Sequence, residues 1–92
     1  DYIVFNHPAY PHKSLIKQIK GLPGAQLILQ NGRLRMGQDT FTLLTYNSKG
    51  EKLKPLQLKS IPPDTIFVAG THPRSFDSRY ESFGLVHQSQ IK

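Results

Sequence analysis

The dipeptide Asn31-Gly32 constrains the fold of this chain more than any other feature of its sequence. It separates two strand-like runs, QLILQ before it and RLRM after it. Because Asn-Gly between such runs favours a tight two-residue turn, residues 26–36 predict a β-hairpin. The register places Leu29 opposite Leu34 and gives the hairpin one apolar face and one largely polar face. The apolar face holds Leu27, Leu29, Leu34 and Met36. The other face holds Ile28, Gln30, Arg33 and Arg35.

Short β-rich runs bounded by proline and glycine make up the rest of the sequence, and no stretch keeps a helical period. They predict further strands at residues 2–5, 14–20, 40–47, 54–59, 65–70 and 83–91. The run TIFVAG is nearly all apolar, which is typical of a central strand, while Pro8 and Pro11 predict a break in regular pairing after the first run. We therefore expect one domain over residues 1–92 with a mainly β fold: a compact antiparallel β domain with few or no helices.

The chain carries an excess of positive charge. Twelve Lys and Arg residues against six Asp and Glu residues give a formal net charge of +6. Such an excess suits an anionic partner, so one hypothesis is a small basic β-barrel that binds nucleic acid or an acidic protein. Arg33, Arg35 and the lysines from Lys49 to Lys59 would carry that function, but aromatic residues are not interleaved with them as single-stranded nucleic-acid platforms require. Cysteine is absent, which excludes a disulfide scaffold, and no apolar run approaches the roughly 20 residues that cross a bilayer.

Lys17 stands where an apolar residue is expected. In SLIKQIKG a strand places Leu15, Lys17 and Ile19 on one face, so the lysine lies between two aliphatic side chains. Burial there would remove water from the amine and favour its neutral form, which can take a proton from a hydroxyl nucleophile. The alternative is an edge strand from which Lys17 reaches water along its methylene stem. The first interpretation makes Lys17 a general-base candidate that needs a serine partner.

Two segments together resemble the sequence pattern of the type I signal (leader) peptidases. IKQIKGLPG resembles the Lys-Arg-x-x-Gly-x-Pro-Gly box of that family, with Lys17 on its lysine. GTHPRSFDSRYESFG resembles the family's final box, Gly-Asp-Asn-x-x-x-Ser-x-Asp-Ser-Arg-x-x-Gly. The residues that fall on this final box are Gly70, Ser75, Asp77, Ser78, Arg79 and Gly84. The opening DYIVFNHP is similar to the preceding Gly-Asp-x-Val-x-Phe box, and the boxes stand in the family's order.

The resemblance implies a serine endopeptidase with a Ser-Lys dyad, on the signal-peptidase β fold and without a metal or other cofactor. Lys17 would be the general base, and Ser75 would hydrogen-bond its amine and orient it. The substrate would add as a β-strand next to the strand of Lys17, with Ile16 helping to form a small apolar pocket. The residues expected to contact the substrate are Ser14, Leu15 and Ile16. The residues expected to support the site are Gly70, Asp77, Ser78 and Arg79, with Asp77 and Arg79 forming an ion pair.

The resemblance also implies a longer, membrane-anchored protein, of which residues 1–92 are the C-terminal part of the catalytic core. The family's nucleophilic serine lies in a Ser-x-x-Pro box, and none precedes Lys17. We therefore expect the nucleophile and the anchor upstream of this chain, and no activity from the 92 residues alone. The site would lie on the periplasmic face of the bacterial cytoplasmic membrane and cleave signal peptides from exported preproteins. The short spacing from Lys17 to Ser75 and the sequence HPRSFDSR resemble the pilin-maturing enzymes of conjugative transfer, whose substrates are pilin precursors; nucleic acid is not an expected partner.

Some residues depart from this pattern, and other functions can be written for the same chain. Gln18 stands on the family's arginine and Thr71 on its aspartate, so two opposite charges are missing together and neither is left unpaired. A Ser-His-Asp site can be written with His72 and Asp77, but closeness in sequence is not triad geometry. A non-catalytic signal-peptidase-like scaffold is a further alternative, against which the presence of Lys17 argues. The histidines are too scattered to predict a metal site: His7, His12, His72 and His87.

Overall fold

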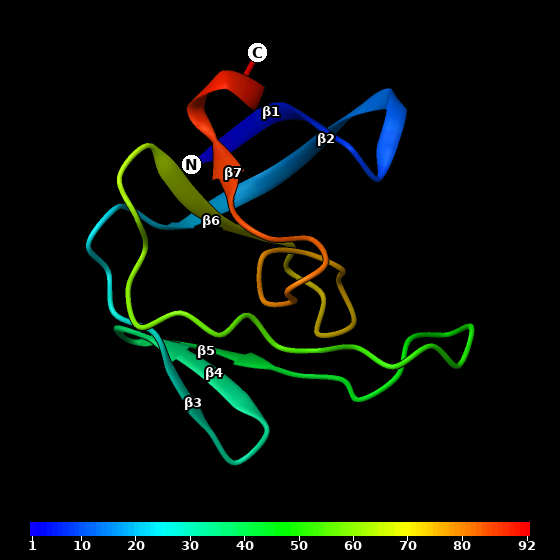
Figure 1. The fold of residues 1–92 in the computed structure, drawn as a ribbon, viewed down its shortest axis with the longest axis vertical. Helices are drawn as coiled ribbons and strands as arrows, with labels where there is room; N and C mark the ends of the chain where they lie inside the picture. Colours follow the sequence, from blue (N-terminus) through cyan, green and yellow to red (C-terminus); the bar gives the residue numbers. More distant parts are fainter.

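Two antiparallel β-sheets make up the computed structural model, which describes residues 1–92. Its strands are β1 (Tyr2–His7), β2 (Tyr10–Gly21), β3 (Ile28–Gln30), β4 (Arg33–Met36), β5 (Asp39–Thr42), β6 (Thr65–Ala69) and β7 (Val86–His87), followed by a 3-10 turn, η1, at Gln88–Gln90. The first sheet has the order β1-β2-β6-β7 and the second the order β3-β4-β5 (Figure 1). The predicted fold class, mainly antiparallel β with few or no helices, is confirmed. The structure contains no helix with the length and apolar character needed to cross a membrane.

The first sheet begins with a long hairpin of β1 and β2. Its register pairs Ile3 with Lys17 and Phe5 with Leu15, and it shifts near the turn, between Asn6 and His7. The break in regular pairing predicted at Pro8 and Pro11 is confirmed: Pro8 lies in the turn, and residues 11–13, although part of β2, have no ladder partner because the register jumps from His7–Tyr10 to Asn6–Ser14. Pro11 is exposed and lies within the register shift, where the absence of one ladder N–H is tolerated.

The second sheet contains the hairpin that Asn31-Gly32 predicts. Leu29 pairs with Leu34, which confirms the predicted register. Asn31 and Gly32 both have positive φ, at 52° and 72°, as a type I′ turn requires. Leu34 is buried, but Leu29 is 42% exposed, so the predicted apolar face is buried on β4 and only partly covered on β3.

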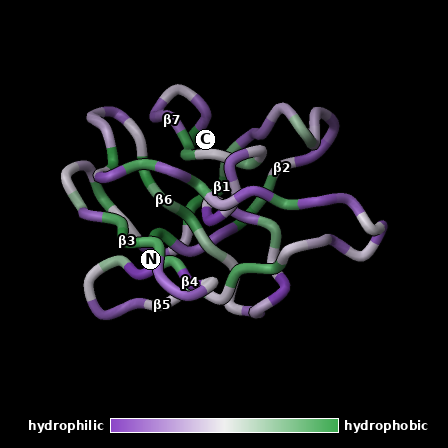
Figure 2. Tube along the Cα trace, turned by 60° about the horizontal axis from the view of Figure 1, so that its bottom comes forward, coloured by the Kyte–Doolittle hydropathy of each residue, from purple (hydrophilic) through white to green (hydrophobic).

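Strand β6 is the centre of the molecule, and all five of its residues are buried. Because side chains alternate along a strand, Ile66 and Val68 face one core while Phe67 and Ala69 face another. The core between the two sheets, which we call the intersheet core, consists of Leu27, Leu34, Met36, Phe41, Leu56, Ile61, Phe67 and Ala69. The core on the other side of the first sheet, which we call the outer core, consists of Phe5, Ile66, Val68, Phe83 and Val86. Figure 2 shows β6 as a hydrophobic segment surrounded by more hydrophilic loops.

Three predicted strands are wrong or shortened. Residues 54–59 form no strand; Pro55 makes an isolated bridge with Tyr80, and Leu56 N donates to Arg79 O at 2.9 Å. This segment lies beside an irregular loop. Its alternation of apolar and polar residues therefore buries Leu56 but forms no ladder of strand hydrogen bonds. The strand predicted for residues 83–91 is reduced to β7, because the chain turns into η1 directly after it. The strand predicted for residues 40–47 ends at Thr42.

Candidate active site

Lys17 lies on the face of β2 that carries Leu15 and Ile19, and both of these neighbours pack against the outer core. Its side chain is half-buried. The amine donates a hydrogen bond to Ser75, with 3.1 Å between Nζ and Oγ. The two residues are 58 positions apart in the sequence, so only the folded chain brings them together.

Ser75 lies in the irregular segment that follows β6, in contact with Gly70. Its N–H donates to His72 O at 3.0 Å, which closes a turn and fixes the backbone that carries the hydroxyl. A Cβ on Gly70 would collide with Ser75 Oγ and would lie 3.5 Å from Lys17 Nζ. Only glycine therefore leaves room for the hydroxyl beside the amine.

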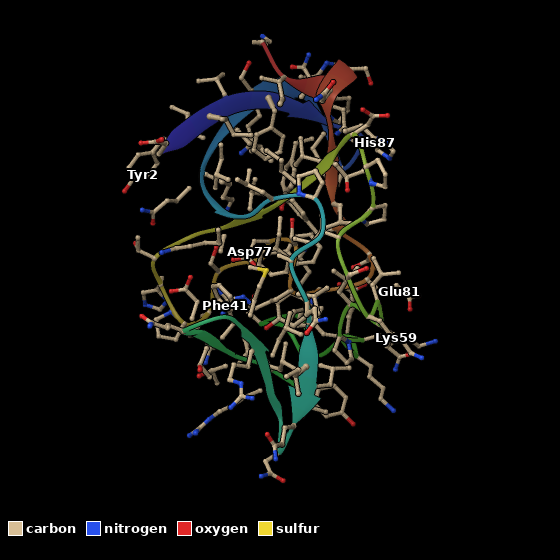
Figure 3. The ribbon with its side chains drawn as sticks, turned by 90° about the vertical axis from the view of Figure 1, so that its left-hand side faces the viewer. Tyr2, Phe41, Lys59, Asp77, Glu81 and His87 are labelled. Carbon is tan, nitrogen blue, oxygen red and sulfur yellow. The ribbon has the colours of Figure 1, made fainter.

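Asp77 and Arg79 form a buried ion pair behind this hydroxyl. Asp77 is 0% exposed and Arg79 is 2% exposed. The guanidinium is bidentate, with Nε 2.7 Å from Asp77 Oδ1 and Nη2 2.9 Å from Oδ2. Asp77 also accepts hydrogen bonds from the backbone N–H of Gly70, at 3.0 Å, and of Arg79, at 3.1 Å. The carboxylate thus joins the end of β6 to the loop that carries Ser75, in the interior between the two sheets (Figure 3).

The Nη1 group of Arg79 joins this loop to the second sheet and also bonds within the loop. Its Nη1 donates to Thr42 O at 3.1 Å and to Pro73 O at 3.2 Å, and the guanidinium lies 5.3 Å from the centre of the Phe41 ring. Because each guanidinium nitrogen donates to a backbone carbonyl or to the carboxylate, the buried charge is both paired and hydrogen-bonded. Sequence reasoning did not identify the two carbonyl partners, since any residue type supplies a backbone carbonyl.

Ser78 makes a separate connection to β6. Its hydroxyl accepts a hydrogen bond from Val68 N at 3.0 Å, and its own N–H donates to Val68 O at 3.1 Å. The loop therefore satisfies both the N–H and the carbonyl of Val68. These two bonds fix the position of the loop, and of Ser75 within it, along β6.

One edge of β2 is free of any partner strand at Ser14, Leu15 and Ile16. β1 occupies the opposite edge along this stretch, whereas β6 pairs only from Gln18 to Gly21. Ile19 N donates to Asp1 O on the β1 side, so the two-residue alternation turns the backbone groups of Ser14 and Ile16 toward the free edge. The Ile16 side chain is 65% exposed and lines none of the cavities, so the small apolar pocket expected there is not formed within this chain.

A polar cavity of about 310 Å³ lies between the end of β2, β5 and the loop after β6. Gln18 and Thr71, the two neutral residues at the positions where the resemblance predicts opposite charges, both line it. The other lining residues are Lys20, Asp39, Thr40, Phe41, Thr42, Gly70, His72, Pro73 and Arg79. Sequence reasoning did not identify this cavity, because its walls come from three separate parts of the chain.

No second serine forms a hydrogen bond with the Lys17 amine. A Ser-x-x-Pro spacing does occur after Lys17, at Ser60, but Ser60 is exposed and its backbone bridges to Gln26. Nowhere do three or more His, Cys, Asp or Glu side chains converge on a position that could hold a metal ion. His72 accepts a hydrogen bond from Arg74 N and makes none with Asp77, so the structure does not bring a Ser-His-Asp arrangement together.

His7 has a structural environment instead. It is buried and stacks on Phe83, with ring centres 4.1 Å apart. Its Nδ1 accepts from Ala9 N at 3.0 Å, so the Nε2 that lies 2.7 Å from Phe83 O carries the proton. His7 therefore joins the β1–β2 hairpin to the segment before β7.

Comparison with known proteins gives a family and a related fold. The family model described as "Signal peptidase, peptidase S26" matches residues 1–92. The crystal structure of a signal peptidase I from Enterococcus faecalis V583 is similar, with a TM-score of 0.65 and 28% sequence identity over 100% of this chain and 90% of that chain. No curated protein matches the sequence.

Proposed function

The chain belongs to the signal peptidase, peptidase S26, family, and from this membership we propose that it carries the general base of a Ser-Lys serine endopeptidase. The resemblance to signal peptidases seen in the sequence is thereby confirmed at the level of the family. Membership supports a peptidase function of signal-peptidase type, with preproteins as substrates. The single observation that carries the finer proposal is the 3.1 Å hydrogen bond between Lys17 Nζ and Ser75 Oγ.

In the proposed mechanism the Lys17 amine takes the proton of a serine hydroxyl as that oxygen attacks the scissile carbonyl. The resulting ammonium gives the proton to the leaving amine, and a water activated by Lys17 then releases the acyl group. Ser75 is the positioning residue, because it holds the amine on the side of Gly70. We propose that the nucleophilic serine and a membrane anchor belong to a part of the protein outside these 92 residues, so that this chain alone is inactive.

The substrate lies along the free edge of β2. The backbone groups of Ser14 and Ile16 are available there to pair with an extended peptide, and Leu15 faces the same side of the sheet as Lys17. Gly70, Asp77, Ser78 and Arg79 keep the loop of Ser75 in place. We place the catalytic domain on the periplasmic face of the cytoplasmic membrane, and we propose pilin precursors of conjugative transfer as the specific preprotein substrate.

The test is cleavage of preproteins by the full-length protein in detergent, with the new N-terminus identified by mass spectrometry. Lys17→Ala should lower kcat by at least about 10²-fold, which is the usual share of a positioned general base. Lys13→Ala is the matched control, because Lys13 is exposed on the same strand and should leave the rate unchanged. Full activity of Lys17→Ala would refute the proposed base. Cleavage of an ordinary preprotein but not of a pilin precursor would refute only the pilin substrate.

A further inference from the structure

The topology of the first sheet determines where a bound peptide has to leave it. A peptide added beside Ser14 and Ile16 lies in line with β6, since both occupy the same edge of β2. From Gln18 onward that edge is taken, because Gln18 pairs with Ala69. For a peptide that runs parallel to β2, the added strand therefore ends opposite Lys17, and the part of the substrate beyond the cut turns out of the plane of the sheet.

Lys17 and Ser75 fill one of the two directions in which the peptide can turn. The Cβ direction of Gly70 points at Ser75 Oγ and Lys17 Nζ, so these two side chains occupy that face of the sheet. Gln18 follows Lys17 and faces the opposite side. The cavity of about 310 Å³ opens on that opposite side, with Gln18, Gly70 and Thr71 in its wall.

The lining of this cavity is polar. Phe41 is its one large apolar side chain. Lys20 and Asp39 bring one charge of each sign, and neither forms an ion pair, since the salt bridge of the chain is Arg79–Asp77. A short polar side chain placed here can hydrogen-bond the wall, whereas a large apolar one would remove water from these groups without replacing it.

We propose that this cavity is the subsite for the first residue after the cut, and that it selects short polar side chains over large apolar ones. The proposal rests on the proposed function, because it assigns the leaving side of the same reaction. It gives Gln18 and Thr71 a role in specificity, at the two positions where the chain lacks the opposite charges of the family pattern.

The test uses the full-length protein and peptide substrates that are identical except at the first residue after the cut, which is serine in one and leucine in the other. We expect kcat/KM to favour the serine peptide by about tenfold, the factor that one hydrogen bond can supply. The double variant Gln18→Met with Thr71→Val keeps the volume of the wall but removes the amide of Gln18 and the hydroxyl of Thr71. The preference should then fall to about twofold or less.

The matched control is Gln57→Met with Thr45→Val, two exposed residues that do not line the cavity, and its preference should equal that of the wild type. Equal kcat/KM for the two peptides in the wild type, or an unchanged preference in the cavity variant, would overturn the subsite while leaving the peptidase function intact. No cleavage of either peptide by the wild type would overturn the proposed function and the subsite with it.

Discussion

The ion pair of Asp77 and Arg79 gives a quantitative prediction for Asp77→Asn. The substitution keeps the shape of the side chain but leaves a guanidinium that is 2% exposed without its counter-charge. In the wild type the Asp77 carboxylate accepts hydrogen bonds from Gly70 N and from Arg79. In the variant the NH2 group of the asparagine faces one of these donors and cannot accept from it. Removing one partner of a buried pair costs about 3–5 kcal/mol.

That loss is large for a chain of 92 residues, whose free energy of unfolding is expected to be about 5–14 kcal/mol. Because 1 kcal/mol shifts the melting temperature of such a domain by about 4–8 °C, Asp77→Asn should lower Tm by at least about 12 °C. Urea unfolding followed by circular dichroism measures the change in the free energy of unfolding, and a thermal melt followed by the same signal measures the change in Tm. Asp39→Asn is the control, since Asp39 is exposed without a side-chain hydrogen bond and should change stability by less than about 0.5 kcal/mol. Equal stability of the two variants would refute the view that the pair holds the loop.

Three further substitutions test other parts of the structure. Gly70→Ala should displace Ser75, costing about 1–3 kcal/mol of stability and lowering kcat of the full-length protein; a wild-type rate would contradict the close approach. His7→Leu should cost about 1–3 kcal/mol by urea unfolding, because a buried backbone carbonyl loses its partner, and a neutral result would show that water replaces the ring. Gln18→Arg with Thr71→Asp should show a favourable coupling of about 0.3–1 kcal/mol in a double-mutant cycle on the free energy of unfolding. Additive effects of the two single substitutions would mean that the two side chains do not meet.

The parts of the fold that the sequence predicts are those set by local chemistry. Asn31-Gly32 determines its turn because both residues adopt positive φ, and the register of β3 and β4 follows from that turn. The apolar run of β6 predicts a central strand because a strand buried on both faces has no polar alternation.

The errors arise where contacts with residues far away in the sequence decide whether a segment forms a strand and whether its side chains are buried. Residues 54–59 alternate like a strand, yet they run beside the loop of Tyr80 and form only an isolated bridge. Leu29 has the same pattern as Leu34, but β3 is an edge strand and remains partly exposed. Local periodicity contains no information about which strand lies at an edge.

The candidate site divides in the same way. Lys17 is conspicuous in the sequence because it interrupts an apolar face, and the Asp77–Arg79 pair is expected from the resemblance to the final box of the signal peptidases. The polar cavity beside them has no local signal, since Gln18, Thr40 and Thr71 come from three segments that meet only in the folded chain.

The most direct test of the central claim is a double-mutant cycle on the cleavage rate of the full-length protein, with Lys17→Ala, Ser75→Ala and the two combined. If Ser75 acts by orienting the Lys17 amine, its effect disappears once that amine is gone, as for residues that act as a unit. We predict that Ser75→Ala alone lowers kcat by about tenfold or more, and that the double variant is no slower than Lys17→Ala within about threefold. Losses that multiply in the double variant would contradict the account, because the two side chains would then contribute independently.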